Sequence, residues 1–418
     1  MRIQRFGPDA GATDVRGLFP PSPEVEDDVR AILEEVREGR DAAVRRLTER
    51  FDRAEVGPES LAVPPAEIEA SLGVLEPRVL DGLRTAIANV KAVARAQLRD
   101  AAVLELEQGQ RVEMDEVPLR RAGAYVPGGR APYPSTAVMC AATARVAGVE
   151  ELAVCAPPGP GGRAHPAILA ACCLCGVTEV YRMGGAQAIA ALALGTESVR
   201  PVDVIVGPGN AYVQEAKRQL AGVVGIDGVA GPSELVLVAS RGADPELAAL
   251  DLLAQAEHGP NTLLAAISPD TGLLDAVAEA VGRLAPERPS VPDGVLALVQ
   301  ANDARGAVLL ADEIAPEHLQ LAGDEVEALS ARVRRAGCLF TGRDAGPAFG
   351  DYVAGSNHVL PTGGAARFGS ALSVATFRRR MARVSLPGGA AGRLAPAGAA
   401  VARAEGFPVH GESMERRA

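Results

Sequence analysis

The first hundred residues carry apolar side chains at intervals of three and four, the spacing that places them on one face of a helix. The first such face comprises Val25, Val29, Ile32, Leu33 and Val36. Ser22 can cap this helix with Pro23 at its first position, and Gly39 can end it. A second face follows Pro77 and comprises Leu80, Leu83, Ile87, Val90 and Ala94. The N-terminal region is therefore predicted to be mainly helical.

Beyond this region, short β-prone runs alternate with longer stretches of helical spacing. A polar turn around Gly109 separates residues 103–106 from 111–114, which predicts a β-hairpin. From residue 125 onward the predicted strands are 152–156, 179–183, 202–206, 235–239, 263–267, 307–310 and 338–341. Strands that alternate with helices are typical of βαβ units and a parallel sheet.

We therefore predict an α/β fold with two doubly wound, Rossmann-like parallel-sheet domains and small helical extensions at both termini. The predicted division is an N-terminal extension (1–21), a large α/β domain (22–124 together with 234–371), a second α/β domain (125–233) and a C-terminal tail (372–418). The tail has little apolar periodicity and cannot build its own core, so we expect it to dock onto another surface.

Composition and charge limit the classes of molecule that the chain is expected to bind. Its 418 residues are 48% hydrophobic and carry a formal net charge of −11. This balance argues against nucleic-acid binding, which needs a basic face, and favours small molecules. The N-terminus lacks the apolar core of a signal peptide, and the longest apolar run, 167–177, is too short to span a bilayer. We therefore expect a cytoplasmic protein with no membrane partner.

Two clusters of reactive or charged residues have simple structural interpretations. Cys172, Cys173 and Cys175 lie within the apolar run 167–177 and lack the second half of a zinc framework, so we expect hydrophobic packing. The run of three arginines at 378–380 is expected to form a solvated helix face rather than a phosphate clamp.

The five histidines are unevenly distributed, and four of them lie in short polar islands. These four are His258, His318, His358 and His410. Histidine is the commonest metal ligand and titrates near neutral pH, so this allocation predicts one metal and acid–base centre. The fifth, His165, precedes a proline at the start of a helical stretch and is predicted to be a surface or capping residue.

Two of these islands can be placed on predicted elements. Gln255 and His258 fall on the last turn of a helix that starts after Asp244, and they face the same way. Taken alone, this pair is weak evidence for a metal site and fits a solvent-facing helix end better. Asp351 and His358 follow the strand 338–341, in a loop at the carboxyl side of the sheet, where open α/β sheets bind ligands.

A third island, which contains Glu317 and His318, and two glycine turns carry further candidate chemistry. Glu317 and His318 are adjacent, a pairing suited to moving two protons in successive steps, although it also fits an ordinary exposed turn. The turns 184–187 and 207–210 each follow a strand and open a helix, so their amides can meet a phosphate or carboxylate. Neither turn is the usual dinucleotide fingerprint.

A set of longer motifs, taken in order, resembles the histidinol dehydrogenase family over nearly the whole chain. The motifs are Ala124-Tyr125-Val126-Pro127-Gly128-Gly129, Ala131-Pro132-Tyr133-Pro134-Ser135, Gly184-Gly185-Ala186-Gln187-Ala188-Ile189-Ala190, Gly207-Pro208-Gly209-Asn210, Ala230-Gly231-Pro232-Ser233-Glu234, Gln255-Ala256-Glu257-His258, Ala315-Pro316-Glu317-His318-Leu319 and Asn357-His358-Val359-Leu360-Pro361-Thr362. Their combination is highly specific, whereas the two ends of the chain match loosely.

The resemblance implies a zinc-dependent, NAD-linked enzyme of histidine biosynthesis that oxidises L-histidinol through L-histidinaldehyde to L-histidine and consumes two NAD and one water. By match to the family's motifs, the zinc ligands are Gln255, His258, Asp351 and His410. His410 is expected to come from the partner chain of a homodimer, which makes the active site composite. The implied substrate contacts are Ser233, Gln255, His258, His318, Asp351, His358, Glu405 and His410.

The resemblance also implies separate catalytic roles. Glu317 activates the hydrating water, and His318 removes protons from the alcohol and then from the hydrated aldehyde. The positions that match NAD contacts are Tyr125, Gln187 and Asn210. The zinc and catalytic residues then belong to the large domain, the NAD contacts to residues 125–233, and the tail docks onto the partner subunit.

Two alternatives remain at this stage. One is a zinc- and NAD-dependent dehydrogenase of the same family that acts on another polar alcohol, such as a sulfonated diol. Residues 131–134 and Glu405 favour the histidinol branch. The other is a catalytically silent metal-binding protein, which would keep the ligands but lose the acid–base pair. Glu317 and His318 are both present, which favours an enzyme.

Overall fold

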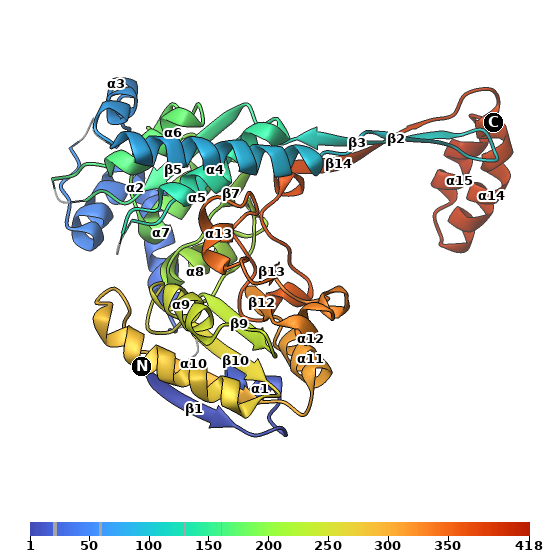
Figure 1. Ribbon diagram of the computed structural model, residues 1–418. Coiled ribbons are helices and arrows are strands. Elements are labelled where there is room, and N and C mark those ends of the chain that lie inside the picture. Colours follow the sequence, from blue (N-terminus) through green and yellow to red (C-terminus); the bar gives the residue numbers. More distant parts are fainter. Residues whose placement is uncertain (20–22, 58–60, 129–130, 160) are drawn as a thin grey trace.

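The computed structural model describes residues 1–19, 23–57, 61–128, 131–159 and 161–418. Figure 1 shows two α/β bodies and a long arm that projects from one of them. Each body contains a parallel sheet with helices on both faces, as the sequence predicts. The proposed cap Ser22 lies outside the described residues, and the helix expected there begins at Glu26 rather than at Pro23.

The first sheet has five parallel strands in the order β6-β5-β4-β7-β8. Its strands are β4 (Arg121–Tyr125), β5 (Glu151–Ala156), β6 (Glu179–Arg182), β7 (Val204–Val206) and β8 (Gly225–Ile226). The connecting helices are α5 (Pro134–Ala147), α6 (Pro166–Leu174), α7 (Gly185–Leu194) and α8 (Ala211–Leu220). The first two helices pack on one face and the last two on the other, so the winding reverses between β4 and β7.

The second sheet has six parallel strands in the order β1-β11-β10-β9-β12-β13. Its strands are β1 (Arg2–Phe6), β9 (Glu234–Ala239), β10 (Leu263–Ser268), β11 (Val295–Gln300), β12 (His318–Ala322) and β13 (Cys338–Thr341). The helices around it are α1 (Ala12–Arg16), α9 (Pro245–Ala256), α10 (Thr271–Leu284), α11 (Ala304–Ile314), α12 (Asp324–Glu327) and α13 (Pro347–Tyr352). α9 and α10 cover one face, and α1 and α11 cover the other.

One predicted strand is wrong, because residues 307–310 lie inside α11. Asp303 caps this helix by accepting a hydrogen bond from the Gly306 amide (2.6 Å), and the buried Ala307, Val308 and Ala311 repeat with helical spacing. Among the strands that were not predicted, β1 pairs in parallel with β11. The N-terminal segment therefore adds an edge strand to the six-stranded sheet.

The long N-terminal helices pack against the five-stranded sheet. They are α2 (Glu26–Asp52), α3 (Pro65–Ala70) and α4 (Pro77–Ala96), and α2 is kinked at Arg40 (φ 47°), next to the predicted stop at Gly39. Leu47 shares a core with α7, and Ile87 shares another with α5. This packing differs from our grouping of residues 22–124 with 234–371, since an amphipathic pattern defines a buried face but not the surface that covers it.

The arm consists of a three-stranded antiparallel sheet and two helices at its tip (Figure 1). The strands are β2 (Ala102–Glu105), β3 (Arg111–Pro118) and β14 (Arg378–Ser385), and the helices are α14 (Ala390–Ala404) and α15 (Pro408–Glu415). The predicted hairpin around Gly109 is confirmed as β2 and β3. The helix expected at 378–380 is wrong, because these arginines begin β14, where Arg380 pairs with Glu116 (3.2 Å).

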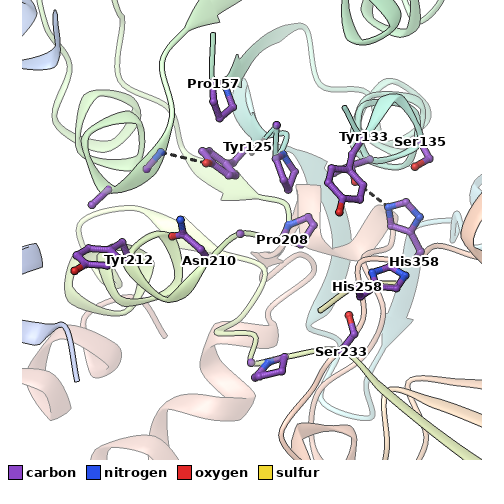
Figure 2. Close-up of a pocket in the computed structure, with 18 of the residues that line it drawn as sticks. Tyr125, Tyr133, Ser135, Pro157, Pro208, Asn210, Tyr212, Ser233, His258 and His358 are labelled. Atoms are coloured by element: carbon purple, nitrogen blue, oxygen red, sulfur yellow. Dashed lines mark hydrogen bonds between the residues drawn. The ribbon is translucent and has the colours of Figure 1, made fainter. Parts of the chain in front are cut away.

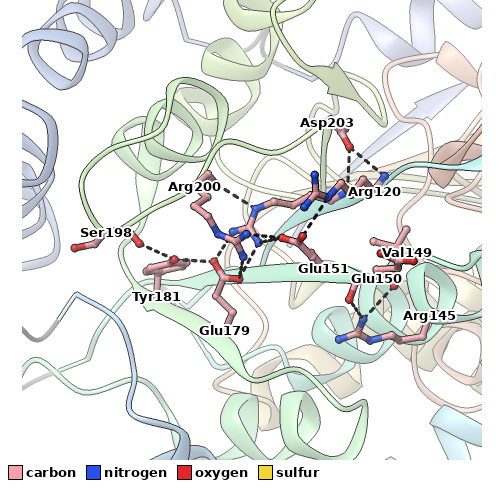
Figure 3. Close-up of polar contacts among 11 residues, drawn as sticks. Arg120, Arg145, Val149, Glu150, Glu151, Glu179, Tyr181, Ser198, Arg200 and Asp203 are labelled. Carbon is pink, nitrogen blue, oxygen red and sulfur yellow. Dashed lines mark hydrogen bonds and ion pairs between the residues drawn. The ribbon is translucent and has the colours of Figure 1, made fainter.

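Ion pairs join the amino ends of three strands of the five-stranded sheet (Figure 3). Arg121 begins β4 and is only 5% exposed; its Nη1 lies 2.8 Å from Glu179 and 3.2 Å from Glu151. Tyr181 donates a hydrogen bond from its hydroxyl to Glu179 (2.7 Å). These contacts fix the starts of β4, β5 and β6 relative to one another, at the edge opposite the carboxyl ends of the strands.

Smaller predictions can also be compared with the structure. His165 is the N-cap of α6, and its Nδ1 accepts a hydrogen bond from the Ala167 amide (3.2 Å), as predicted. Cys172 is fully buried in α6, and its burial raises the pKa of the thiol. In the described part of the chain, no helix combines the length and apolar character needed to cross a membrane. The single-turn 3₁₀ helices are Ser71–Gly73, Ala285–Glu287, Ser330–Arg332, Ala365–Arg367 and Val374–Phe377.

Candidate active site

A cavity of about 700 Å³ is lined by residues of both α/β bodies (Figure 2). Most of the predicted site residues line it: Tyr125, Gln187, Asn210, Ser233, His258, Glu317, His318, Asp351 and His358. The sequence did not single out several other lining residues, among them Phe51 and Asp52 at the end of α2. No motif marked them, because only the packing of α2 brings its last turn to the cavity.

The five-stranded sheet contributes loops at its carboxyl edge, where the winding reverses. Tyr125 ends β4, and its hydroxyl accepts a hydrogen bond from the Gly185 amide (3.1 Å). Gly207 directly follows β7 with φ 113°, and a side chain there would collide with the carbonyl of Tyr125. Asn210 caps α8 through the Val213 amide (3.1 Å). This half of the cavity therefore matches the ligand crevice of a doubly wound sheet.

One amide of each glycine turn meets a carboxylate, as expected, but this carboxylate belongs to the protein itself. The Gly184 amide donates to the carboxylate of Asp52, and the Gly207 amide donates to Asp227 (2.7 Å). The other Asp52 oxygen, Oδ2, is buried without a hydrogen-bond partner in the structure. Burial raises the pKa of Asp52 to about 6. The hydrogen bond from the Gly184 amide lowers this pKa, but it offsets the effect of burial only in part.

A buried ion pair supports the turn at 207–210. Lys217 is 1% exposed, forms an ion pair with Asp227, and donates from its Nζ to the carbonyl of Gly207 (3.1 Å). Asp227 in turn accepts from the amide of the same glycine. Both backbone groups of Gly207 are thus held by one ion pair, which fixes the turn beside Tyr125.

The six-stranded sheet contributes its amino edge, not its carboxyl edge. Ser233 and Glu317 directly precede β9 and β12, and His318 is the first residue of β12. Asp351 was predicted in a loop at the carboxyl side of the sheet, but it lies in α13 and its Oδ1 is 3.3 Å from His318 Nε2. The prediction is wrong because α13 leads the chain back from the end of β13 to the opposite edge.

Glu317 and His318 are buried and oriented by the backbone of β9. Glu317 Oε2 accepts from the Glu234 amide (2.8 Å). His318 Nδ1 lies 3.0 Å from the carbonyl oxygen of Glu234, so this nitrogen donates, and Nε2 lies 3.3 Å from Oδ1 of Asp351, to which it donates when the ring is protonated. Burial alone would lower the pKa of His318, but the carboxylates of Glu317 and Asp351 outweigh it and hold the pKa well above its usual value.

Two predicted metal ligands, His258 and Asp351, line the cavity together with this pair. A third, Gln255, lies in the last turn of α9 and is 2% exposed, and its Nε2 has no hydrogen-bond partner in the structure. His258 lies two residues beyond α9 and lines the cavity with Asp351. His358 donates from Nδ1 to the carbonyl of Asp351 (2.7 Å) and has Nε2 3.1 Å from the hydroxyl of Thr136. Within the described ranges, no group of three or more His, Cys, Asp and Glu side chains is arranged to hold a metal ion.

The two predicted tail residues do not reach the cavity of their own chain. Glu405 follows α14 and His410 lies in α15, both exposed at the tip of the arm (Figure 1). The exposed apolar side chains around them include Val401, Phe407 and Val409. One chain therefore brings together the predicted residues of the body but not those of the tail.

Comparisons with known proteins agree over the whole chain. The family model described as histidinol dehydrogenase matches residues 21–418. The chain is 44% identical to a histidinol dehydrogenase of Gluconobacter oxydans, over 98% of this chain and 94% of that protein, and 45% identical to one of Cereibacter sphaeroides, over 100% and 98%. A crystal structure of histidinol dehydrogenase from Elizabethkingia anophelis has a TM-score of 0.92 at 29% identity, and the match covers 100% of this chain and 98% of that one.

Proposed function

This chain belongs to the histidinol dehydrogenase family and is an NAD-dependent oxidoreductase of histidine biosynthesis, and from this premise we propose how its cavity works. The substrate L-histidinol is oxidised through L-histidinaldehyde to L-histidine, and each step reduces one NAD. The observation that carries the proposal is the buried pair Glu317 and His318, which meets Asp351 and His258 in a cavity lined by loops of the other sheet.

The two residues of the pair have different roles in this proposal. In the first step, His318 accepts the hydroxyl proton of the alcohol through Nε2 while hydride passes to NAD from the carbon that bears this hydroxyl. In the second step, His318 accepts a proton from the hydrated aldehyde. The Nδ1 hydrogen bond to the Glu234 carbonyl supports this role, because it keeps Nε2 free of a proton in the neutral ring. Glu317 activates the water that hydrates the aldehyde, and its carboxylate is fixed by the Glu234 amide.

The residues of the cavity fit a bound zinc ion. Gln255, His258 and Asp351 would hold it through an amide oxygen, an imidazole nitrogen and a carboxylate oxygen, and His258 and Asp351 line the same cavity, which supports this assignment. Such an ion, when bound, orients the substrate and polarises its oxygen. Since Asp351 contributes to the raised pKa of His318, engagement of that carboxylate by a cation would favour the neutral base.

The fourth ligand, His410, would come from a second subunit. Its exposed position at the tip of the arm supports this proposal, because the arm carries it away from its own cavity (Figure 1). The apolar side chains Phe407 and Val409 near it are 54% and 72% exposed, and Phe349 and Tyr352 in α13 beside the cavity are 58% and 60% exposed. Burial of both apolar groups would drive docking of the arm, and Glu405 would then reach the substrate.

The NAD contacts are proposed at the carboxyl edge of the five-stranded sheet. Tyr125, Gln187 and Asn210 line the cavity there, and Gln187 is buried with an Nε2 that has no hydrogen-bond partner in the structure. The amides of Gly184 and Gly207 are occupied by Asp52 and Asp227, which supports weak cofactor binding. Ser233 and His358 would contact the substrate, and the cytoplasmic location remains a prediction.

The direct test follows NADH absorbance after the enzyme, NAD and candidate alcohols are mixed. Histidinol should yield two NADH per molecule, and a sulfonated diol, the alternative substrate class, should yield none. Chelation should stop turnover and zinc should restore it, while the far-ultraviolet circular dichroism stays unchanged, because the proposed ligands lie on separate elements of a large core. Turnover of the diol in preference to histidinol would contradict the substrate assignment, and unfolding on chelation would contradict the separate role of zinc.

A further inference from the structure

Arg16, in the short helix α1, reaches from the N-terminal segment to the strands that carry the catalytic pair. Its Nη1 lies 2.9 Å from Oε1 of Glu234, and its Nε donates to the carbonyl of Ile314 (3.0 Å). Nη2 also donates to the carbonyls of Ile314 and Ala315. The guanidinium therefore binds the first residue of β9 and the end of α11 at the same time.

Glu234, which Arg16 binds, is itself hydrogen-bonded to both catalytic residues. Its Oε2 accepts from the backbone amide of Glu317 (3.1 Å), while its own amide donates to the Glu317 carboxylate (2.8 Å). Its carbonyl accepts from Nδ1 of His318 (3.0 Å). The side chain is only 5% exposed, so Arg16 supplies the positive charge that a buried carboxylate requires.

The segment between α11 and the catalytic pair is strained. Ala315 has φ 51° and ψ 59°, a left-handed conformation that a non-glycine residue rarely adopts, and it is fully buried. Its carbonyl and that of Ile314 are the groups that Arg16 binds. The chain then runs through Pro316 directly into Glu317, so the direction of this turn determines where the pair begins.

We propose that Arg16 and Glu234 are positioning residues that hold Glu317 and His318 in their reactive geometry. This inference rests on the catalytic roles proposed above. Removal of the guanidinium leaves the buried Glu234 carboxylate without its positively charged partner, held only by the backbone amides of Glu317 and Gly363, and frees the strained turn at Ala315. A displacement of about 1 Å at the pair can lower the rate about a hundredfold, whereas substrate and cofactor contacts elsewhere in the cavity are retained.

The test compares Arg16→Met, Arg16→Lys and Glu234→Gln with Arg5→Met. Arg5 is a matched control because it lies in the same N-terminal segment and forms an exposed ion pair with Asp275 (2.7 Å). Arg16→Met and Glu234→Gln should lower kcat about tenfold or more, with KM for histidinol and NAD within about threefold of wild type. Arg16→Lys keeps the positive charge but not the several N–H donors of the guanidinium group, so its kcat should lie between that of Arg16→Met and that of wild type. Arg5→Met should leave kcat unchanged.

A double-mutant cycle separates positioning from general stability. If Arg16 acts through the pair, Arg16→Met should cause no further loss in a His318→Asn background. An equal loss in both backgrounds, or a wild-type kcat in folded Arg16→Met, would overturn the proposal. If Arg16→Met does not fold, a wild-type kcat in Arg16→Lys would overturn it instead. Full activity of His318→Asn alone would refute the catalytic assignment, and the positioning role with it.

Discussion

The buried carboxylate of Asp52, with one oxygen lacking a hydrogen bond, leads to a quantitative prediction about stability and pH. This side chain accepts one hydrogen bond from the Gly184 amide, and its Oδ2 is buried without a partner in the structure. Burial raises its pKa from 3.8 to about 6, so the folded state binds this proton more tightly than the unfolded state. Stability is therefore lost as the pH rises between these two values, and Asp52→Asn should remove that loss.

The magnitude follows from the two pKa values. With 1.36 kcal/mol per pKa unit, ionisation of Asp52 lowers the free energy of unfolding by up to about 3 kcal/mol at pH 8. At pH 5 the same linkage gives roughly half of this amount, because the folded state is still mostly protonated. The stability gained by Asp52→Asn over wild type should thus grow by about 1 kcal/mol between pH 5 and pH 8.

Urea unfolding followed by circular dichroism at the two pH values measures this difference. Asp81→Asn is a suitable control, because it also removes a carboxylate but from an exposed position on α4, where Asp81 pairs with Arg84. The control should differ from wild type by a similar amount at both pH values. A gain for Asp52→Asn that is equal at pH 5 and pH 8, or larger at pH 5, would refute the reasoning.

Two further predictions concern catalysis and assembly. His318→Asn should impair oxidation of both histidinol and histidinaldehyde, whereas Glu317→Gln should chiefly slow the aldehyde step; equal losses in both half-reactions for both variants would contradict their separate roles. Mixing His258→Ala with His410→Ala homodimers under subunit exchange should restore activity, because one site of the mixed dimer then carries both lesions and the other neither. Confirmed mixed dimers without activity would show that His410 does not complete the partner's site.

The chemistry-bearing residues of the body could be found from the sequence, but their position on the sheet could not. Glu317 and His318 are adjacent and belong to a specific motif, so their pairing was evident. Their location at the amino edge depends on which elements reverse the chain. Asp351 illustrates this, since α13 returns it to the edge opposite the one expected from its place after β13.

Packing between distant segments was also beyond the sequence. Periodicity identified α4 and the first part of α2 correctly, yet it could not show that both cover the five-stranded sheet. The contact of Arg16 with Glu234 joins residues 218 positions apart, and neither belongs to a pattern that indicates the other. Conversely, the short apolar run 307–310 predicts a strand, although such a run fits a strand and a helix equally well. In the structure it lies in a helix, which Asp303 caps.

The arm has a consequence for how activity depends on protein concentration. If two cavities are each completed by the tip of the other chain's arm, a lone subunit holds an unfinished site, however well its body is folded. Specific activity should then fall on dilution below the dimer dissociation constant. Newly synthesised chains should stay inactive until they form dimers. The tip of the arm would thus make the activity of one chain depend on the presence of another.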